Sequence, residues 1–78
     1  MKILFLGRVA DALGMRQIDL ALPADIADVE ALRCLLGNDY PALLDPTVRV
    51  IVNDAVALGS QPVAADDEVA FFPPVSGG

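Results

Sequence analysis

The chain has 78 residues, enough for one small domain and too few for a second. Apolar residues make up 55% of it and charged residues 21%, a composition typical of a compact globular protein rather than a disordered or collagen-like one. Five basic and eleven acidic side chains give a formal net charge of -6, which excludes an electrostatic attraction to nucleic acid or anionic lipid. We therefore expect neither a nucleic-acid partner nor a membrane partner.

Two residue counts exclude whole classes of active site. The sequence contains no histidine, which excludes His metal ligands and Ser-His or Cys-His nucleophile pairs. Cys34 is the only cysteine, so no intrachain disulfide can form, and we expect an inert, half-buried thiol. No apolar run approaches the roughly twenty residues of a membrane span, and the N-terminus lacks a signal-peptide cleavage site. These features indicate a soluble, untargeted, cytoplasmic protein.

The first half of the chain predicts two strands and one helix. A continuous apolar run predicts a first strand over about residues 2–9, and residues 10–15 predict a turn or a single helical turn. Alternating polar and apolar residues over 17–22 predict a one-sided second strand. An apolar stripe at spacings of three and four predicts a helix over about residues 28–37, which either Asp25 or Asp28 can cap. The residues of that stripe are Val29, Leu32, Leu35 and Leu36.

The second half predicts three more strands, at about residues 48–52, 56–58 and 68–72. The Asn53-Asp54 pair predicts a tight turn with left-handed backbone, and the segment between Pro41 and Pro46 is expected to be coil or a short turn. The complete order predicts an α+β fold, a mixed sheet of four to five strands packed on one main helix. This is the ubiquitin-like, or β-grasp, arrangement. We expect the domain to cover residues 1–72 and a flexible tail to cover 73–78.

The end of the sequence is its most informative part. Pro73 and Pro74 fix φ and keep the residue before each extended, so a chain leaving the last strand is directed outward. Gly77 and Gly78 have no side chains, so they can enter a channel too narrow for a Cβ atom and leave the terminal carbonyl open to attack. A carboxylate is a poor electrophile and must first be activated, for example as a mixed anhydride with AMP. The alternative is a frayed chain end without a function.

The end of the chain also resembles a known family. The segment Asp67-Glu68-Val69-Ala70-Phe71-Phe72-Pro73-Pro74-Val75-Ser76-Gly77-Gly78 is similar, almost letter for letter, to the C-terminus of the small, sulfur-carrying subunits of molybdopterin synthase. The resemblance implies that an adenylyltransferase of the ubiquitin-activating type adenylates Gly78 with ATP and magnesium. A sulfurtransferase that carries a persulfide would then convert Gly78 to a thiocarboxylate, the sulfur donor to cyclic pyranopterin monophosphate in molybdopterin biosynthesis.

The resemblance also implies a division of roles. Catalytic residues would lie on a large subunit, in a heterotetramer of two small and two large subunits, so the isolated chain would not be an enzyme. It would hold no metal and no permanent cofactor. Gly77 and Gly78 would form the reactive end. The expected partner-binding residues are Phe72, Pro73, Pro74, Val75 and Ser76. Strand alternation places Phe72 on the face opposite Val69 and Phe71, where it can anchor a partner.

Some interpretations stay open at this point. A carrier for thiamine or tRNA thiolation would share the fold and the Gly-Gly end, and a ubiquitin-like binding module would share the fold alone. Asp66, Asp67 and Glu68 predict a solvated turn rather than a metal site. Many members of the resembled family have Gly where this chain has Asp66, so a positive φ can be required there.

Overall fold

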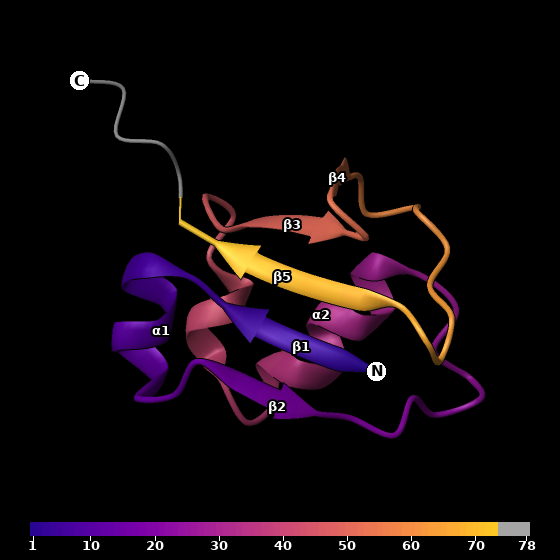
Figure 1. Ribbon diagram of the computed structural model, residues 1–78, viewed down its shortest axis with the longest axis horizontal. Helices are drawn as coiled ribbons and strands as arrows, with labels where there is room; N and C mark the ends of the chain where they lie inside the picture. Colours follow the sequence, from indigo (N-terminus) through magenta and orange to yellow (C-terminus); the bar gives the residue numbers. More distant parts are fainter. Residues whose placement is uncertain (74–78) are drawn as a thin grey trace.

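A five-stranded mixed sheet forms the body of the molecule in the computed structural model, which describes residues 1–73 (Figure 1). The elements are β1 (Lys2–Phe5), α1 (Gly7–Leu13), β2 (Gln17–Asp19), α2 (Val29–Gly37), the 3₁₀ helix η1 (Pro41–Leu44), β3 (Arg49–Val52), β4 (Ala55–Ala57) and β5 (Glu68–Phe72). The strand order is β2-β1-β5-β3-β4. β1 and β5 run parallel, and the other neighbouring pairs are antiparallel. This confirms the predicted ubiquitin-like β-grasp fold.

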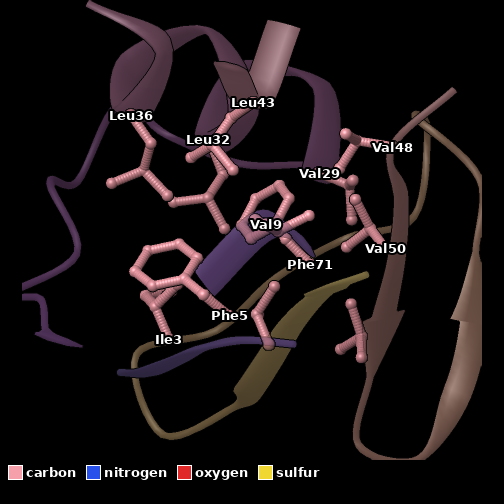
Figure 2. Close-up of a cluster of buried hydrophobic side chains, with 12 residues drawn as sticks. Ile3, Phe5, Val9, Val29, Leu32, Leu36, Leu43, Val48, Val50 and Phe71 are labelled. Carbon is pink, nitrogen blue, oxygen red and sulfur yellow. The ribbon is translucent and has the colours of Figure 1, made fainter. Parts of the chain in front are cut away.

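The core lies between one face of this sheet and the helices (Figure 2). Ile3 and Phe5 of β1 are in register with Val69 and Phe71 of β5, and all four side chains are at most 2% exposed. The two phenylalanine rings stack with their centroids 6.2 Å apart. Apolar side chains from α1, α2, η1 and β3 close the core above them, as Figure 2 shows. The central strand pair therefore contributes the most deeply buried part of the domain.

Helix α2 forms as the sequence predicts. Its apolar stripe buries Val29, Leu32 and Leu36 against the sheet, while Glu30 lies on the exposed side. Asp28, rather than Asp25, is the N-cap: its Oδ1 accepts a hydrogen bond of 2.8 Å from the backbone N–H of Ala31. No helix of the described residues 1–73 has both the length and the apolar character that crossing a membrane requires.

The predicted first strand is wrong in its second half. β1 ends at Phe5, and helix α1 takes the place of the predicted end of the strand and includes the helical turn that was one of the two alternatives for residues 10–15. Gly7 has φ of 52°, a left-handed conformation that turns the chain out of the sheet. Val9 and Leu13, four residues apart, then place one helical face on the core. Gly14, with φ of 71°, ends this helix as its C-cap.

Smaller differences have local causes. β2 ends at Asp19 instead of residue 22, because its partner β1 begins at Lys2 and offers no strand beyond that point. The segment expected to be coil is the 3₁₀ helix η1, which buries Leu43 completely. The predicted turn is confirmed, because Asn53 and Asp54 have φ of 49° and 70°.

The hairpin turn is tied to the start of β5 by side-chain hydrogen bonds. Asn53 Nδ2 donates to Asp67 Oδ1 at 2.9 Å, and Asn53 Oδ1 accepts from the backbone N–H of Glu68 at 3.0 Å. Asp67 Oδ2 also accepts from the N–H of Ala64 at 2.8 Å. The bond from Asn53, followed by the bond from Ala64, lowers the pKa of the Asp67 carboxyl below its ordinary value. Asp66 does not have a positive φ, so the substitution of Gly by Asp there needs no left-handed backbone.

The hydrogen bond from the Ala31 N–H to Asp28 predicts that removing the Asp28 carboxylate destabilises the fold more than removing the Asp25 carboxylate does. Asp28→Ala should lower the free energy of unfolding by about 1 kcal/mol, because the Ala31 N–H loses its acceptor. Asp25→Ala is the matched control and should change it by less than about 0.5 kcal/mol, since Asp25 is exposed. Urea denaturation measures both. Equal losses in the two variants would contradict the assignment of Asp28 as the cap.

The Asp67 network predicts a pH dependence of stability. Because the folded state holds the Asp67 pKa below 3.8, its hydrogen bonds stabilise the fold above that pH and are lost as the pH falls through the lower folded-state value. Asp67→Ala should therefore lower stability relative to wild type near neutral pH, and the difference should shrink below pH 3.8. Urea denaturation from neutral pH down to acid measures this difference, and a constant gap would contradict the network.

Candidate functional site: the end of the last strand

The last strand holds its C-terminal end firmly at the centre of the sheet. β5 is hydrogen-bonded to β1 on one side and to β3 on the other. Phe71 is 0% exposed, and its carbonyl accepts a hydrogen bond of 3.0 Å from the backbone N–H of Leu6, just beyond the end of β1. The main chain is therefore held within the sheet up to Phe72.

Phe72 lies on the opposite face of the sheet from Phe71, as strand alternation predicts. It is in register with Arg49 of β3. Its side chain is half-buried rather than freely exposed. Part of the ring is thus supported by the sheet, and part remains accessible to a partner.

Pro73 is the last of the described residues, and it packs closely over the start of α1. A Cβ atom added to Gly7 would lie 3.2 Å from Pro73 Cγ, closer than most carbon contacts. Gly7 thus serves both the left-handed turn and the approach of the proline ring. The other predicted tail residues, Pro74, Val75, Ser76, Gly77 and Gly78, lie outside the described residues, and their roles stay predictions.

A shallow open groove of about 260 Å³ runs beside Pro73, between α1 and the segment that follows η1. Arg8, Asp45 and Thr47 supply its polar side chains. The Asp45 carboxylate accepts bonds from the Thr47 N–H at 2.9 Å and from its hydroxyl at 2.7 Å. These bonds, with the nearby Arg33 guanidinium adding to them, hold the pKa of Asp45 below its ordinary value. The wall of the groove thus carries charged side chains, and hydrogen bonds between Asp45 and Thr47 hold one part of it in place.

The face of the sheet away from the helices carries a row of apolar side chains. Leu4, Ala70, Ile51 and Val56 lie in one register across four neighbouring strands. Val56, on the edge strand, is 72% exposed. Phe72 lies on the same face, two residues beyond Ala70 along β5. An apolar surface therefore crosses the sheet and includes Phe72 at the C-terminal end of β5.

That apolar row was missed by the sequence analysis. The sequence feature that could have revealed the row is a lack of alternation between polar and apolar residues. Leu4 and Ile51 are apolar at positions where a strand with one solvent-facing side would have polar residues. The continuous apolar run around Leu4 suits a strand that is covered on both faces or is central in its sheet, and β1 is an inner strand between β2 and β5. The structure shows that the second face is only partly covered, since Leu4 and Ile51 are of intermediate exposure.

The remaining reactive side chains do not converge on this site. Cys34 is exposed, contrary to the half-buried position expected, because the buried stripe of α2 lies at Val29, Leu32 and Leu36. Its sulfur lies 3.8 Å from Glu30 Oε1. Among residues 1–73, no three His, Cys, Asp or Glu side chains come together in a way that could hold a metal ion.

The comparisons with known proteins agree with this architecture. The family model described as the ThiS family matches residues 3–78. The molybdopterin synthase sulfur carrier subunit of Escherichia coli (strain K12) is 37% identical over 81 residues, covering 99% of this chain and 98% of that protein. Small archaeal modifier protein 1 of Haloferax volcanii is 34% identical over 80 residues, covering 90% of this chain and 91% of that protein.

A solved structure has the same fold. The crystal structure of SAMP1 from Haloferax volcanii superposes with a TM-score of 0.81 at 30% identity, covering 100% of this chain and 98% of that one. The family model spans almost the entire sequence, including the strand that carries Phe72. The chain is a ubiquitin-like protein that belongs to the ThiS family.

Proposed function

We propose that this chain is the sulfur carrier subunit of a molybdopterin synthase and that the carboxylate of Gly78 carries the sulfur. The observation that carries the proposal is the similarity, over nearly the whole chain, to the molybdopterin synthase sulfur carrier subunit of Escherichia coli. The central strand β5 supports it, because it ends at Phe72, only six residues before Gly78 in the sequence.

The proposed cycle has three steps. A Gly78 carboxylate oxygen attacks the α-phosphorus of ATP on an adenylyltransferase of the ubiquitin-activating type, and pyrophosphate leaves. The terminal sulfur of a persulfide on a sulfurtransferase then attacks the acyl carbon and AMP leaves, which gives an acyl disulfide. A second thiol attacks the sulfurtransferase sulfur of that disulfide, so that a new disulfide forms and the thiocarboxylate is released. The thiocarboxylate sulfur finally bonds to a carbon of cyclic pyranopterin monophosphate, and water cleaves the acyl–sulfur bond to return the Gly78 carboxylate. ATP and magnesium belong to the activating enzyme, so the proposal gives this chain no resident cofactor.

In this proposal the domain contributes position and recognition rather than catalysis. Phe72, Pro73 and the apolar row would dock on a large subunit that supplies the catalytic residues, in a heterotetramer of two small and two large chains. Pro74, Val75 and Ser76 would line the path of Gly77 and Gly78 into that subunit. The lack of histidine and the absence of a metal-binding cluster among residues 1–73 are compatible with this division. We place the cycle in the cytoplasm, where a free thiol such as Cys34 stays reduced.

A second function is favoured by a specific similarity. The structural match to small archaeal modifier protein 1 supports a role as a protein modifier, in which a target lysine attacks the adenylated Gly78 and AMP leaves. Carriers for thiamine or tRNA thiolation would use the same thiocarboxylate with another acceptor. These functions differ in the molecule that accepts the acyl group or the sulfur atom. A reconstitution with purified enzymes can therefore distinguish them.

The test of the main proposal is a two-stage reconstitution. The chain is incubated with the adenylyltransferase of its own organism, ATP, magnesium and a sulfurtransferase charged with persulfide, and its intact mass is measured. We expect one oxygen to be replaced by one sulfur, and addition of the large subunit and cyclic pyranopterin monophosphate should yield molybdopterin. The control omits ATP. An unchanged mass would contradict any sulfur-carrier role, whereas a thiocarboxylate that yields no molybdopterin would point to another thiolation pathway.

Deletion of Gly78 should prevent formation of the thiocarboxylate without affecting the stability of the fold. The free energy of unfolding should change by less than about 0.5 kcal/mol, because the core lies entirely within residues 3–71. The thiocarboxylate should not form, because the preceding Gly77 carboxylate stops one residue short of the activating site. Urea denaturation and the mass assay measure the two effects. A deleted chain that is loaded as well as wild type would contradict the role of Gly78.

Substitution of Phe72 tests the proposed docking face. Phe72→Ala should weaken binding to the large subunit by about tenfold or more, as expected for an aromatic interface anchor. Leu44→Ala is the matched control, because Leu44 is a half-exposed apolar residue on the helical side of the domain. Isothermal titration calorimetry measures both affinities, with urea denaturation to confirm folding. Equal affinities in the two variants would show that the docking face lies elsewhere.

A further inference from the structure

The basic residues of this chain are unequally divided between arginine and lysine. Four of the five are arginines, and Lys2 is the single lysine. Two of the arginines surround the point where the chain leaves the sheet: Arg49 is in register with Phe72, and Arg8 shares the groove beside Pro73. Both side chains are exposed. The strand end that leads to the terminal glycine is therefore bordered by guanidinium groups.

The primary amines lie at the opposite end of the sheet. Lys2 is in register with Glu68, the first residue of β5, and the strand carries the chain about 13 Å further before it reaches Phe72. The N-terminal amine of Met1 donates to the Leu20 carbonyl at 2.9 Å, also at the beginning of β1. Figure 1 shows the N-terminus at the end of the sheet away from the arrowheads of β1 and β5.

Lysine and arginine differ in their reactivity toward an activated carboxyl group. A lysine amine that has lost its proton attacks an acyl carbon: the C–N bond forms, the bond to the leaving group breaks, and the amine proton passes to solvent. On an acyl-adenylate the leaving group is AMP, and the product is a stable amide. A guanidinium stays protonated near neutral pH and does not react in this way. Arginine thus supplies positive charge near an activated ester without supplying a nucleophile.

The terminal residues are long enough for such self-capture. Five residues, the number that follow Pro73, span at most about 17 Å. Side chains at positions 8 and 49 border Pro73 and Phe72, so their separation from Pro73 is shorter than the contour length of the five residues that follow it. Intramolecular reaction at such separations proceeds at a high effective concentration of amine. A lysine in either place would be within reach of its own activated terminus.

We propose that arginine in place of lysine at positions 8 and 49 protects the activated Gly78 acyl group from capture by its own domain, leaving Lys2 as the one side-chain amine to which a second copy could be joined. This inference rests on the proposed activation of Gly78. It adds a chemical requirement for positions 8 and 49, namely that their side chains be cationic without being nucleophilic.

The test uses a chemically activated terminus, so that no activating enzyme is needed. Full-length chains with a Gly78 thioester, prepared by intein cleavage with a small thiol, are incubated at mildly alkaline pH and followed by intact mass. All carry Cys34→Ser, which removes the exposed thiol as a competing nucleophile. Hydrolysis gives the free acid, whereas self-capture gives a product lighter than the acid by one water. Arg49→Lys and Arg8→Lys should form the cyclic product about tenfold faster than the parent.

Two control variants test whether cyclisation requires an amine, and whether that amine must lie near Phe72 and Pro73. Gln61→Lys adds a lysine in an exposed loop beside the start of α2, and it should hydrolyse like the parent. Arg49→Gln removes the guanidinium without adding an amine, and it should also stay linear. The proposal is overturned if the two Arg→Lys variants only hydrolyse, or if the parent itself cyclises at Lys2 or Met1 at the same rate. A chain that behaves as expected here yet is never adenylated in the reconstitution would refute the proposed function alone.

Discussion

The parallel pairing of β1 with β5 is the constraint on which the rest of the structure depends. It joins the first and last segments of the chain at the centre of the sheet, and it brings together the completely buried side chains of Ile3, Val69 and Phe71. Without this pair the last strand would have only β3 as a neighbour, and the helices would have no continuous surface to cover. Because the pairing with β1 extends to Phe71 and the pairing with β3 to Phe72, the main chain is held in the sheet to the end of β5.

This placement explains how a small domain without a catalytic cluster in its described part can take part in chemistry. The proposed reactive group is a main-chain carboxylate, so the side chains need only deliver it and recognise the proteins that load and unload it. The apolar row on the open face of the sheet and the half-buried Phe72 suit recognition, and the close contact between Gly7 and Pro73 holds the last described residue against the start of α1. The arginines at positions 8 and 49 fit the same division, because they border the exit without competing for the activated carbon.

Much of this architecture could be predicted from sequence, because local patterns and tertiary structure agree. The stripe of α2, the Asn53-Asp54 turn and the last strand are found where the patterns indicate. The first strand could not be bounded correctly, since its apolar run continues into residues that pack on the core from helix α1. The left-handed backbone of Gly7 turns the chain there, and Pro73, 66 residues later in the sequence, packs against it. The exposure of Cys34 and the partly open second face of the sheet likewise depend on which elements cover which surface.

The central claim is that the domain exists to present its terminal glycine for loading with sulfur. The most direct measurement is the intact mass of the chain isolated without reducing or alkylating agents from its native cells during molybdenum cofactor synthesis. A population that ends in a thiocarboxylate at Gly78 is the result predicted. A terminus found only as the plain carboxylate, or only in amide linkage to other proteins, would contradict the sulfur-carrier account.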